Sequence, residues 1–255
     1  MSDALRLPAL GALALLAAGC SQSVRVSGTV FATHGFEAPP LADAEITVVS
    51  PPSTNVLATT VTGSDGSFIL SLPPAIGVAL EVRAEGYATT IFHGNSPFSG
   101  ELAVLDHDVF GVTEAELAAE RARFAGCEGA DGPGAVVFGE VRVFGLVDPI
   151  TGDSPLTSEG QVDVLAVGDD GDVSATYGGC YLDEAGAAHD PTAEFTGESG
   201  RFAVFGVEPG LHELQAQWQA VPGEWIANYY PAWVPAGEEQ VVLPQWPAWV
   251  DPPGF

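Results

Sequence analysis

Several short segments of the chain alternate between apolar and polar residues. Residues 24–30 (VRVSGTV) and 137–143 (VFGEVRV) each place valine or glycine at every second position, with mostly polar residues between them. Side chains of a strand point alternately to its two faces, so a period of two indicates a strand with one face in a core. Both segments are therefore predicted to be half-buried strands.

A seven-residue motif occurs twice, as TGSDGSF at 62–68 and as TGESGRF at 196–202. Its Gly, Ser and Asp content is typical of a tight turn, and Gly66 and Gly200 suit a left-handed backbone conformation. Each copy is predicted to be the turn of a β-hairpin. Phe68 and Phe202 then begin strands that return to a core.

The elements around the two motifs follow the same order. A second strand precedes each turn, at 44–50 and 160–167, and a proline-bearing corner and a further strand follow it. The inward-facing residues of those further strands are predicted to be Val78, Leu80, Val82 and Ala84 in the first copy, and His212, Leu214, Ala216 and Trp218 in the second. Short strands separated by turn signals are typical of β-sandwiches. The second copy is longer by about 23 residues, which an insertion around 168–190 accommodates most simply.

One helix is predicted between the two copies, in residues 111–126 (GVTEAELAAERARFAG). Thr113 and Glu116 have the spacing of a capping box, and Leu117 and Phe124 are its large apolar residues. The chain is thus predicted to be all-β apart from this helix, with one β-sandwich in residues 24–110, a helical linker in 111–134 and a second β-sandwich in 135–255.

The N-terminus has the features of an export signal. Residues 1–19 contain an apolar run that is too short to span a bilayer, and residues 16–20 (LAAGC) resemble the lipobox of bacterial lipoproteins. The resemblance implies that residues 1–19 are a signal peptide, that Cys20 carries a lipid anchored in the membrane, and that residues 20–23 form a short tether. Ser21 resembles a signal for sorting to the outer membrane of a Gram-negative bacterium. We therefore expect a lipid-anchored protein of the cell envelope.

Charge narrows the range of functions. The formal net charge is −27, and the chain contains no lysine. P-loop phosphate sites, pyridoxal Schiff bases and protein-kinase ATP sites all require a lysine, so these are excluded. Nucleic-acid binding is not expected either, because it depends on cationic side chains that neutralise phosphates.

Two cysteines remain after Cys20, namely Cys127 and Cys180. An even pair in an oxidising compartment favours a disulfide, and this bridge is predicted. A zinc site is not expected, because no second cysteine or histidine lies at the usual ligand spacing from either residue. No metal, cofactor or catalytic residue is predicted elsewhere. The acidic segments 168–172 (GDDGD) and 106–108 (DHD) are interpreted as solvated turn and strand residues.

The first copy resembles a known family. Its pattern V-x-G-x-V, A-x-I-x-V, T-G-x-x-G-x-F, L-P and L-x-V-x-A-x-G-Y, in residues 26–87, is similar to the carboxypeptidase regulatory-like domain, and residues 137–243 are a looser copy. The resemblance implies two prealbumin-like Greek-key β-sandwiches without catalytic residues. Such modules serve structural or interaction roles in envelope lipoproteins.

Two enzyme families have related sandwiches. Residues 162–172 and 196–210 are similar to the strand and turn pattern of intradiol dioxygenases, which bind iron through two tyrosines and two histidines. The phenolates would come from Tyr177, Tyr181, Tyr229 and Tyr230. The expected His-x-His pair is missing, since only His212 follows the turn, and alternation places it on the apolar face. The C-terminal signature of transthyretin-like hydrolases and a Gly-x-Ser-x-Gly motif are also missing from the sequence.

All five tryptophans lie in the last 38 residues. Trp218 and Trp233 are predicted to be buried, whereas Trp246 and Trp249 lie in a proline-rich tail and are candidates for a surface patch that stacks on sugar rings. The sequence as a whole predicts a non-enzymatic envelope lipoprotein that acts as a structural, ligand-binding or protein-binding module. Its expected partners are the membrane and envelope proteins or polysaccharides. The alternatives are a carbohydrate-binding surface protein and a degenerate intradiol-dioxygenase-like metal enzyme.

Overall fold

The structure is a computed structural model, and it describes about seven tenths of the chain. The described residues are 23–33, 38–51, 53, 55–103, 109–132, 134–144, 156–158, 162–168, 176–197, 200–221, 224–235, 240–243 and 248–250. The predicted signal peptide and Cys20 lie outside them. Within them the protein is mostly β, with several sheets and one short helix, in agreement with the predicted fold class.

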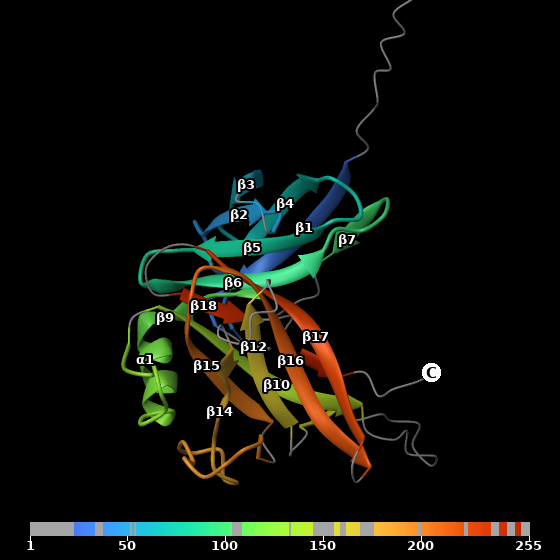
Figure 1. Ribbon diagram of the computed structural model, residues 1–255. Helices are drawn as coiled ribbons and strands as arrows, with labels where there is room; N and C mark the ends of the chain where they lie inside the picture. The colour runs from blue at the N-terminus through green and yellow to red at the C-terminus, as the bar shows by residue number, and fades with distance from the viewer. Residues whose placement is uncertain are drawn as a thin grey trace, which may run out of the picture.

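The first unit is a β-sandwich at the top of Figure 1. Its strands are β1 (Val24–Phe31), β2 (Glu45–Val49), β3 (Val56–Val61), β4 (Ser67–Leu72), β5 (Gly77–Arg83), β6 (Tyr87–Asn95), β7 (Glu101–Ala103), β8 (Val109–Phe110) and β9 (Val112–Thr113). One sheet has the order β4-β1-β7, and the other contains β6-β5-β2-β3. The predicted alternation of β1 is confirmed, since Val24, Val26 and Val30 are buried and Arg25 is exposed.

The two repeated motifs form matching turns. Gly66 has φ 71° and Gly200 has φ 64°, in the left-handed region that glycine tolerates. In each turn the backbone N–H of this glycine donates to the carbonyl of the glycine three residues earlier, at 2.9 Å. The following Phe68 and Phe202 are buried. The prediction of two tight turns is therefore confirmed, but neither turn closes a β-hairpin. Strand β3 before the first turn pairs with β2, whereas β4 after it pairs with β1 in the other sheet. After the second turn, β15 pairs with β10 and with β14, which ends at Tyr181, well before the turn.

The second unit forms a further pair of packed sheets. Its strands are β10 (Ala135–Phe144), β11 (Leu156–Ser158), β12 (Val162–Gly168), β13 (Tyr177–Gly178), β14 (Cys180–Tyr181), β15 (Arg201–Val207), β16 (Gly210–Val221), β17 (Glu224–Val234), β18 (Gln240–Leu243) and β19 (Ala248–Val250). The sheet β13-β12-β16-β17 packs against β14-β15-β10. Of the predicted inward residues of β16, His212, Leu214 and Ala216 are buried, and the side chain of Trp218 lies outside the described part of the structure.

Helix α1 (Glu114–Arg123) begins with the predicted capping box. The Glu116 backbone N–H donates to Thr113 Oγ1 at 3.1 Å, and the Thr113 N–H donates to Glu116 Oε2 at 2.8 Å. Leu117 and Phe124 are buried. Phe124 packs on Phe138 and Phe205, with ring centroids at 6.1 and 5.8 Å. The helix therefore covers a face of the sheet formed by β10 and β15.

This packing corrects the prediction that the strand opening the second unit is half-buried. Val136 and Val137 are both fully buried, and Phe138 is 9% exposed. Val137 belongs to the core of the second sandwich, while Val136 and Phe138 belong to the core that α1 covers. Both faces of β10 are thus in contact with apolar residues, and alternation alone indicates only one of them.

The two units share one continuous sheet. Strand β18 runs parallel to β10 on one side and to β6 on the other, so that Val241 lies beside both Val136 and Thr90. The described strands of this sheet follow the order β14-β15-β10-β18-β6-β5-β2-β3. The sequence predicted only a helix between the units, whereas the structure adds a direct backbone connection, visible at the centre of Figure 1.

A side-chain contact supports this junction. The Trp233 backbone N–H, in β17 of the second unit, donates to His93 Nε2, in β6 of the first, at 2.6 Å. Strand β5 is buried on both faces nearby, since Val82 faces the core of the first sandwich and Ala79 belongs to the core of the second. The only helix among the described residues, α1, is too short and too charged to cross a membrane.

Candidate functional site

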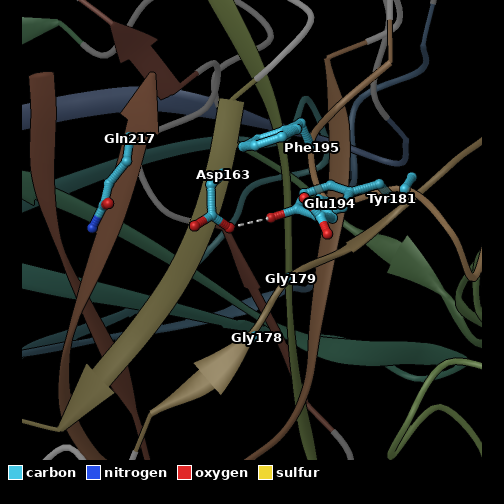
Figure 2. Close-up of a pocket in the computed structure, with 8 residues that line it drawn as sticks. Asp163, Gly178, Gly179, Tyr181, Glu194, Phe195 and Gln217 are labelled. Atoms are coloured by element: carbon cyan, nitrogen blue, oxygen red, sulfur yellow. Dashed lines mark hydrogen bonds between the residues drawn. The ribbon is translucent and has the colours of Figure 1, made fainter. Parts of the chain in front are cut away.

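An open hollow of about 560 Å³ lies beside β12 in the second unit. Figure 2 shows its lining, in which Asp163 on β12 lies between Gln217 on β16 and a group formed by Glu194, Phe195 and Tyr181. Gly178 on β13 and Gly179 complete that side. We refer to this cavity as the Asp163 hollow.

The sheet register places Asp163 directly opposite Gln217. Residues opposite one another on antiparallel strands share a face of the sheet. Their neighbours Val164 and Ala216 point into the core and are buried. Asp163 and Gln217 therefore extend from the face opposite that core, where their polar groups are available to a ligand.

Hydrogen bonds along β16 orient Gln217. Its Nε2 donates to Gln215 Oε1 at 3.1 Å, and Gln215 Nε2 donates to Glu213 Oε1 at 3.0 Å. The three side chains form a row along one face of the strand. Ordering of this kind before binding reduces the entropy that a ligand has to overcome.

Tyr181 connects the hollow to the edge of β12. Its hydroxyl accepts a hydrogen bond from the Val164 backbone N–H at 2.7 Å and donates one to Asp163 Oδ1 at 2.9 Å. Figure 2 shows the latter bond as a dashed line. Burial raises the pKa of Tyr181 far above its usual value, and the negative charge of Asp163 acts in the same direction. Tyr181 is therefore a neutral donor that holds the Asp163 carboxylate in place.

Two glycines shape the same wall for different reasons. A Cβ at Gly179 would lie 2.7 Å from both the Tyr181 hydroxyl and the Val164 carbonyl oxygen, so only glycine allows this approach. A Cβ at Gly178 would meet no atom within 4 Å. The space beside Gly178 is therefore open, and a larger side chain would extend into it without a backbone clash.

The rest of this wall comes from the segment that directly follows the insertion expected around 168–190. Asp190 Oδ1 accepts hydrogen bonds from the Thr192 backbone N–H at 2.8 Å and from Thr192 Oγ1 at 2.7 Å, and these bonds lower the pKa of Asp190. This turn leads to Glu194, which is exposed, and to Phe195, which is half-buried. The segment after the insertion thus supplies a carboxylate and an aromatic ring to the hollow.

The predicted disulfide between Cys127 and Cys180 is present, with the two Cα atoms 6.2 Å apart. It joins the loop after α1 to β14, next to Tyr181. The structure also brings His189 to this bridge, with its ring nitrogen and both sulfurs within 4.8 Å of one another. This neighbour was not predicted from the sequence, because its approach depends on a reversal of the chain between Leu182 and His189.

The tryptophans predicted as a surface patch are only partly covered by the structure. Trp246 lies outside the described residues. The backbone of Trp249 belongs to β19, where it pairs with Arg142 of β10, so this part of the tail is a strand. Trp233 is buried, as predicted, with 7% of its surface exposed. Segments 104–108 and 169–175, which include most of the two acidic motifs, also lie outside the described residues.

The structure confirms that His212 is on the apolar face. It is 6% exposed, and its Nε2 lies 2.7 Å from the Glu208 carbonyl oxygen. A carbonyl only accepts hydrogen bonds, so Nε2 carries the proton and donates it. The Tyr177 ring packs edge-on against His212, with centroids 5.8 Å apart. These contacts are those of a core histidine.

The Asp163 hollow itself was not predicted. Asp163 and Gln217 occupy outward positions of alternating strands, where polar residues are expected on any solvated sheet. Glu194 and Phe195 lie between the predicted insertion and the repeated turn motif, in a stretch without a recognisable motif. Only the position of this segment beside β12 distinguishes these residues from ordinary surface residues.

No family model matches the chain, and no curated protein matches it. Among solved structures, it aligns with the Bacillus anthracis TIE protein at 10% identity and a TM-score of 0.30, covering 90% of this chain and 34% of that one. The chain thus spans about a third of the TIE protein's length.

Two further alignments are equally distant. Shaft pilin SpaA from Lactobacillus rhamnosus GG aligns at 14% identity and a TM-score of 0.26, with 92% and 98% of the two chains covered. A DUF3823 family protein from Parabacteroides merdae aligns at 9% identity and a TM-score of 0.29, with 77% and 91% covered. At these scores, the function has to be argued from the chain's own residues, and the resemblance to the carboxypeptidase regulatory-like domain stays a prediction.

Proposed function

We propose that this chain is a non-enzymatic binding module of the cell envelope and that its ligand occupies the Asp163 hollow. The observation that carries the proposal is the ordered polar lining of that hollow, where Tyr181 fixes Asp163 and the row along β16 fixes Gln217. Pre-formed concave sites with a few oriented polar groups are typical of small-ligand binding. The Asp163 carboxylate accepts a hydrogen bond from the Tyr181 hydroxyl, an arrangement that suits a fixed hydrogen-bond acceptor in a binding site.

The envelope location rests on the N-terminal sequence and on the disulfide. The lipobox-like residues 16–20 support a lipid on Cys20, and Ser21 supports the outer membrane of a Gram-negative bacterium. Disulfides persist in oxidising compartments, which include the periplasm and the cell surface. We further propose that both units are prealbumin-like sandwiches of the carboxypeptidase regulatory-like kind, in line with the motif repeated at Gly66 and Gly200.

A neutral saccharide is the ligand class that fits the lining best. Carboxylate and amide groups, here those of Asp163, Glu194 and Gln217, hydrogen-bond readily to hydroxyls, and the Phe195 ring offers an apolar surface to a sugar face. No arginine or lysine lines the hollow within the described residues, and the chain has a net charge of −27, so anionic ligands are disfavoured.

The register extends this site along the sheet. Tyr229 lies opposite Gln215 and Trp225 lies opposite Gln219, which places both aromatic positions on the face that carries Asp163 and Gln217. We therefore propose Trp225 and Tyr229 as contributors to binding. Trp246 and Trp249 remain candidates for sugar binding on the basis of the sequence. A variant with alanine at both positions tests them independently of the Asp163 hollow.

The test uses two leucine substitutions at exposed strand glycines. Both experiments use the mature chain with Cys20→Ser, which requires no lipid. Gly178→Leu fills the hollow, whereas Gly94→Leu adds the same side chain in β6 of the first unit, where a Cβ also meets no atom within 4 Å. Binding to neutral, amino and uronic-acid oligosaccharides is measured by calorimetry and tryptophan fluorescence.

We expect saturable binding of a neutral oligosaccharide that weakens at least about tenfold in Gly178→Leu, a loss of about 1.4 kcal/mol, and is unchanged in Gly94→Leu. If only amino sugars bind, and Gly178→Leu weakens that binding, the site is correct and the ligand is an amino sugar rather than a neutral saccharide. If Gly178→Leu binds every tested ligand as the parent does, the Asp163 hollow is not the binding site.

A further inference from the structure

Three metal-ligating side chains meet where helix α1 ends. Cys127 lies in the loop after the helix, Cys180 in β14, and His189 at the end of the chain reversal that starts at Leu182. The two sulfurs and an imidazole nitrogen all lie within 4.8 Å of one another. This cluster is separate from the lining of the Asp163 hollow, although β14 belongs to both regions.

Each of the three residues is held by the backbone independently of the sulfur–sulfur bond. The Cys127 N–H donates to the Phe124 carbonyl at 3.0 Å, and the His189 N–H donates to the Arg123 carbonyl at 2.6 Å. Cys180 pairs with Ala203 of β15. Reduction of the disulfide therefore leaves three donor groups close together, and small side-chain rotations bring them to the separations around one ion.

The chemistry of this donor set indicates which ion fits. Reduction by a dithiol transfers two electrons and two protons to the bridge and yields two thiols, while the reductant becomes a disulfide. A metal ion then displaces the two thiol protons and binds two thiolates and one neutral imidazole. A divalent ion cancels the two thiolate charges, whereas a monovalent ion leaves one negative charge in a chain that already carries −27.

Zinc meets these requirements. It prefers nitrogen and sulfur ligands in tetrahedral geometry, and two cysteines and one histidine leave a fourth position for water. Cys127 is 8% exposed, while Cys180 and His189 are half-buried, so the cluster lies at the margin of the core and is not fully enclosed by it.

We propose that the reduced protein binds one Zn²⁺ through Cys127, Cys180 and His189, and that this ion replaces the disulfide as the link between the loop after α1 and β14. The loop after α1 and β14 are then linked in both redox states, by the disulfide when the two cysteines are oxidised and by the metal ion when they are reduced. Since Tyr181 follows Cys180 directly, the same link also holds the residue that fixes Asp163 in the hollow.

The experiment uses Co²⁺ as a coloured substitute for Zn²⁺. The mature chain with Cys20→Ser has Cys127 and Cys180 as its only cysteines. We expect the reduced protein to bind one equivalent of Co²⁺ with a thiolate-to-cobalt charge-transfer band, Zn²⁺ to remove the band, and the oxidised protein to show no band. Zn²⁺ should also raise the Tm of the reduced protein and leave that of the oxidised protein unchanged.

His189→Gln separates a three-ligand site from adventitious binding by two thiols. The variant should bind Co²⁺ at least about 100-fold more weakly than the parent, because it retains only two strong ligands. Near-UV circular dichroism of the oxidised variant checks that the fold is intact, and Cys127→Ala/Cys180→Ala serves as the protein without thiols. Equal Co²⁺ affinity in His189→Gln, or no charge-transfer band in the reduced parent, would overturn the proposal.

Discussion

The Tyr181 hydroxyl accepts the backbone N–H of Val164 at 2.7 Å, and it thereby joins two sheets of the second unit. Val164 belongs to β12 and Tyr181 to β14, which lie in different sheets of the sandwich. The hydroxyl takes a position at the edge of β12 just beyond the short β13. One side chain thus completes a sheet edge, closes the core and orients Asp163.

Removal of this hydroxyl should destabilise the second unit. Tyr181→Phe leaves the buried Val164 N–H without this acceptor, and we expect a loss of about 1–3 kcal/mol in the free energy of unfolding. Urea denaturation measures the change, with Tyr87→Phe in the first unit as the matched control. An equal effect of the two substitutions would mean that the hydrogen bond to Val164 contributes no stability.

Stability should also fall at alkaline pH because of the same residue. Burial raises the pKa of Tyr181 above its ordinary value of 10.0, so the folded protein keeps a proton that the unfolded chain loses. The contribution is complete below about pH 10 and declines as the pH rises further. Urea unfolding from pH 8 to 11 should show a steeper decline for the parent than for Tyr181→Phe. Parallel curves would contradict this assignment.

The contact between His93 and Trp233 should contribute to the junction of the two units. His93 Nε2 accepts the Trp233 N–H, and His93→Ala removes this acceptor from a buried donor, at an expected cost of about 1–3 kcal/mol. His93→Gln retains an acceptor of similar reach and should recover part of the loss. Chemical denaturation of both variants measures the difference. Equal destabilisation by alanine and glutamine would show that the hydrogen bond is not the cause.

Strand β18 should make the two units unfold together. It lies between β10 and β6, so a proline at Val241 removes a backbone donor and disturbs the pairing with its neighbours. Differential scanning calorimetry should show one transition for the parent and two for Val241→Pro. Val61→Pro, in the edge strand β3, is the control and should keep a single transition. Two transitions in the parent would contradict the cooperative junction.

The proposed lipid on Cys20 has its own test. Expression of the full chain in a Gram-negative host should place the protein in the membrane fraction, with acyl chains on the mature N-terminus detected by mass spectrometry. Cys20→Ala should appear without lipid and outside that fraction. A Cys20→Ala protein that remains in the membrane fraction to the same extent would show that the anchor lies elsewhere.

The local features of this protein follow from its sequence. The alternation in residues 24–30, the turns at Gly66 and Gly200, and the capping box of Thr113 and Glu116 all depend on residues a few positions apart. Such interactions act over one or two turns of chain and leave a readable pattern. The pairing of Cys127 with Cys180 was also predicted, because the chain has no other cysteine pair once Cys20 is lipidated.

The tertiary structure decided the features that join distant segments. In β5, Glu81 occupies a position that alternation assigns to solvent, yet it is 6% exposed, because the second unit covers that face and Arg83 pairs with its carboxylate at 2.8 Å. Strand β18 has neighbours from both units, and no local pattern specifies a parallel partner about 100 or more residues away. The Asp163 hollow and the approach of His189 to the disulfide likewise exist only once the chain has folded. An alternating pattern indicates that one face of a strand is buried. Whether the other face is also buried, and which strand pairs with an edge strand, depends on packing between the two units.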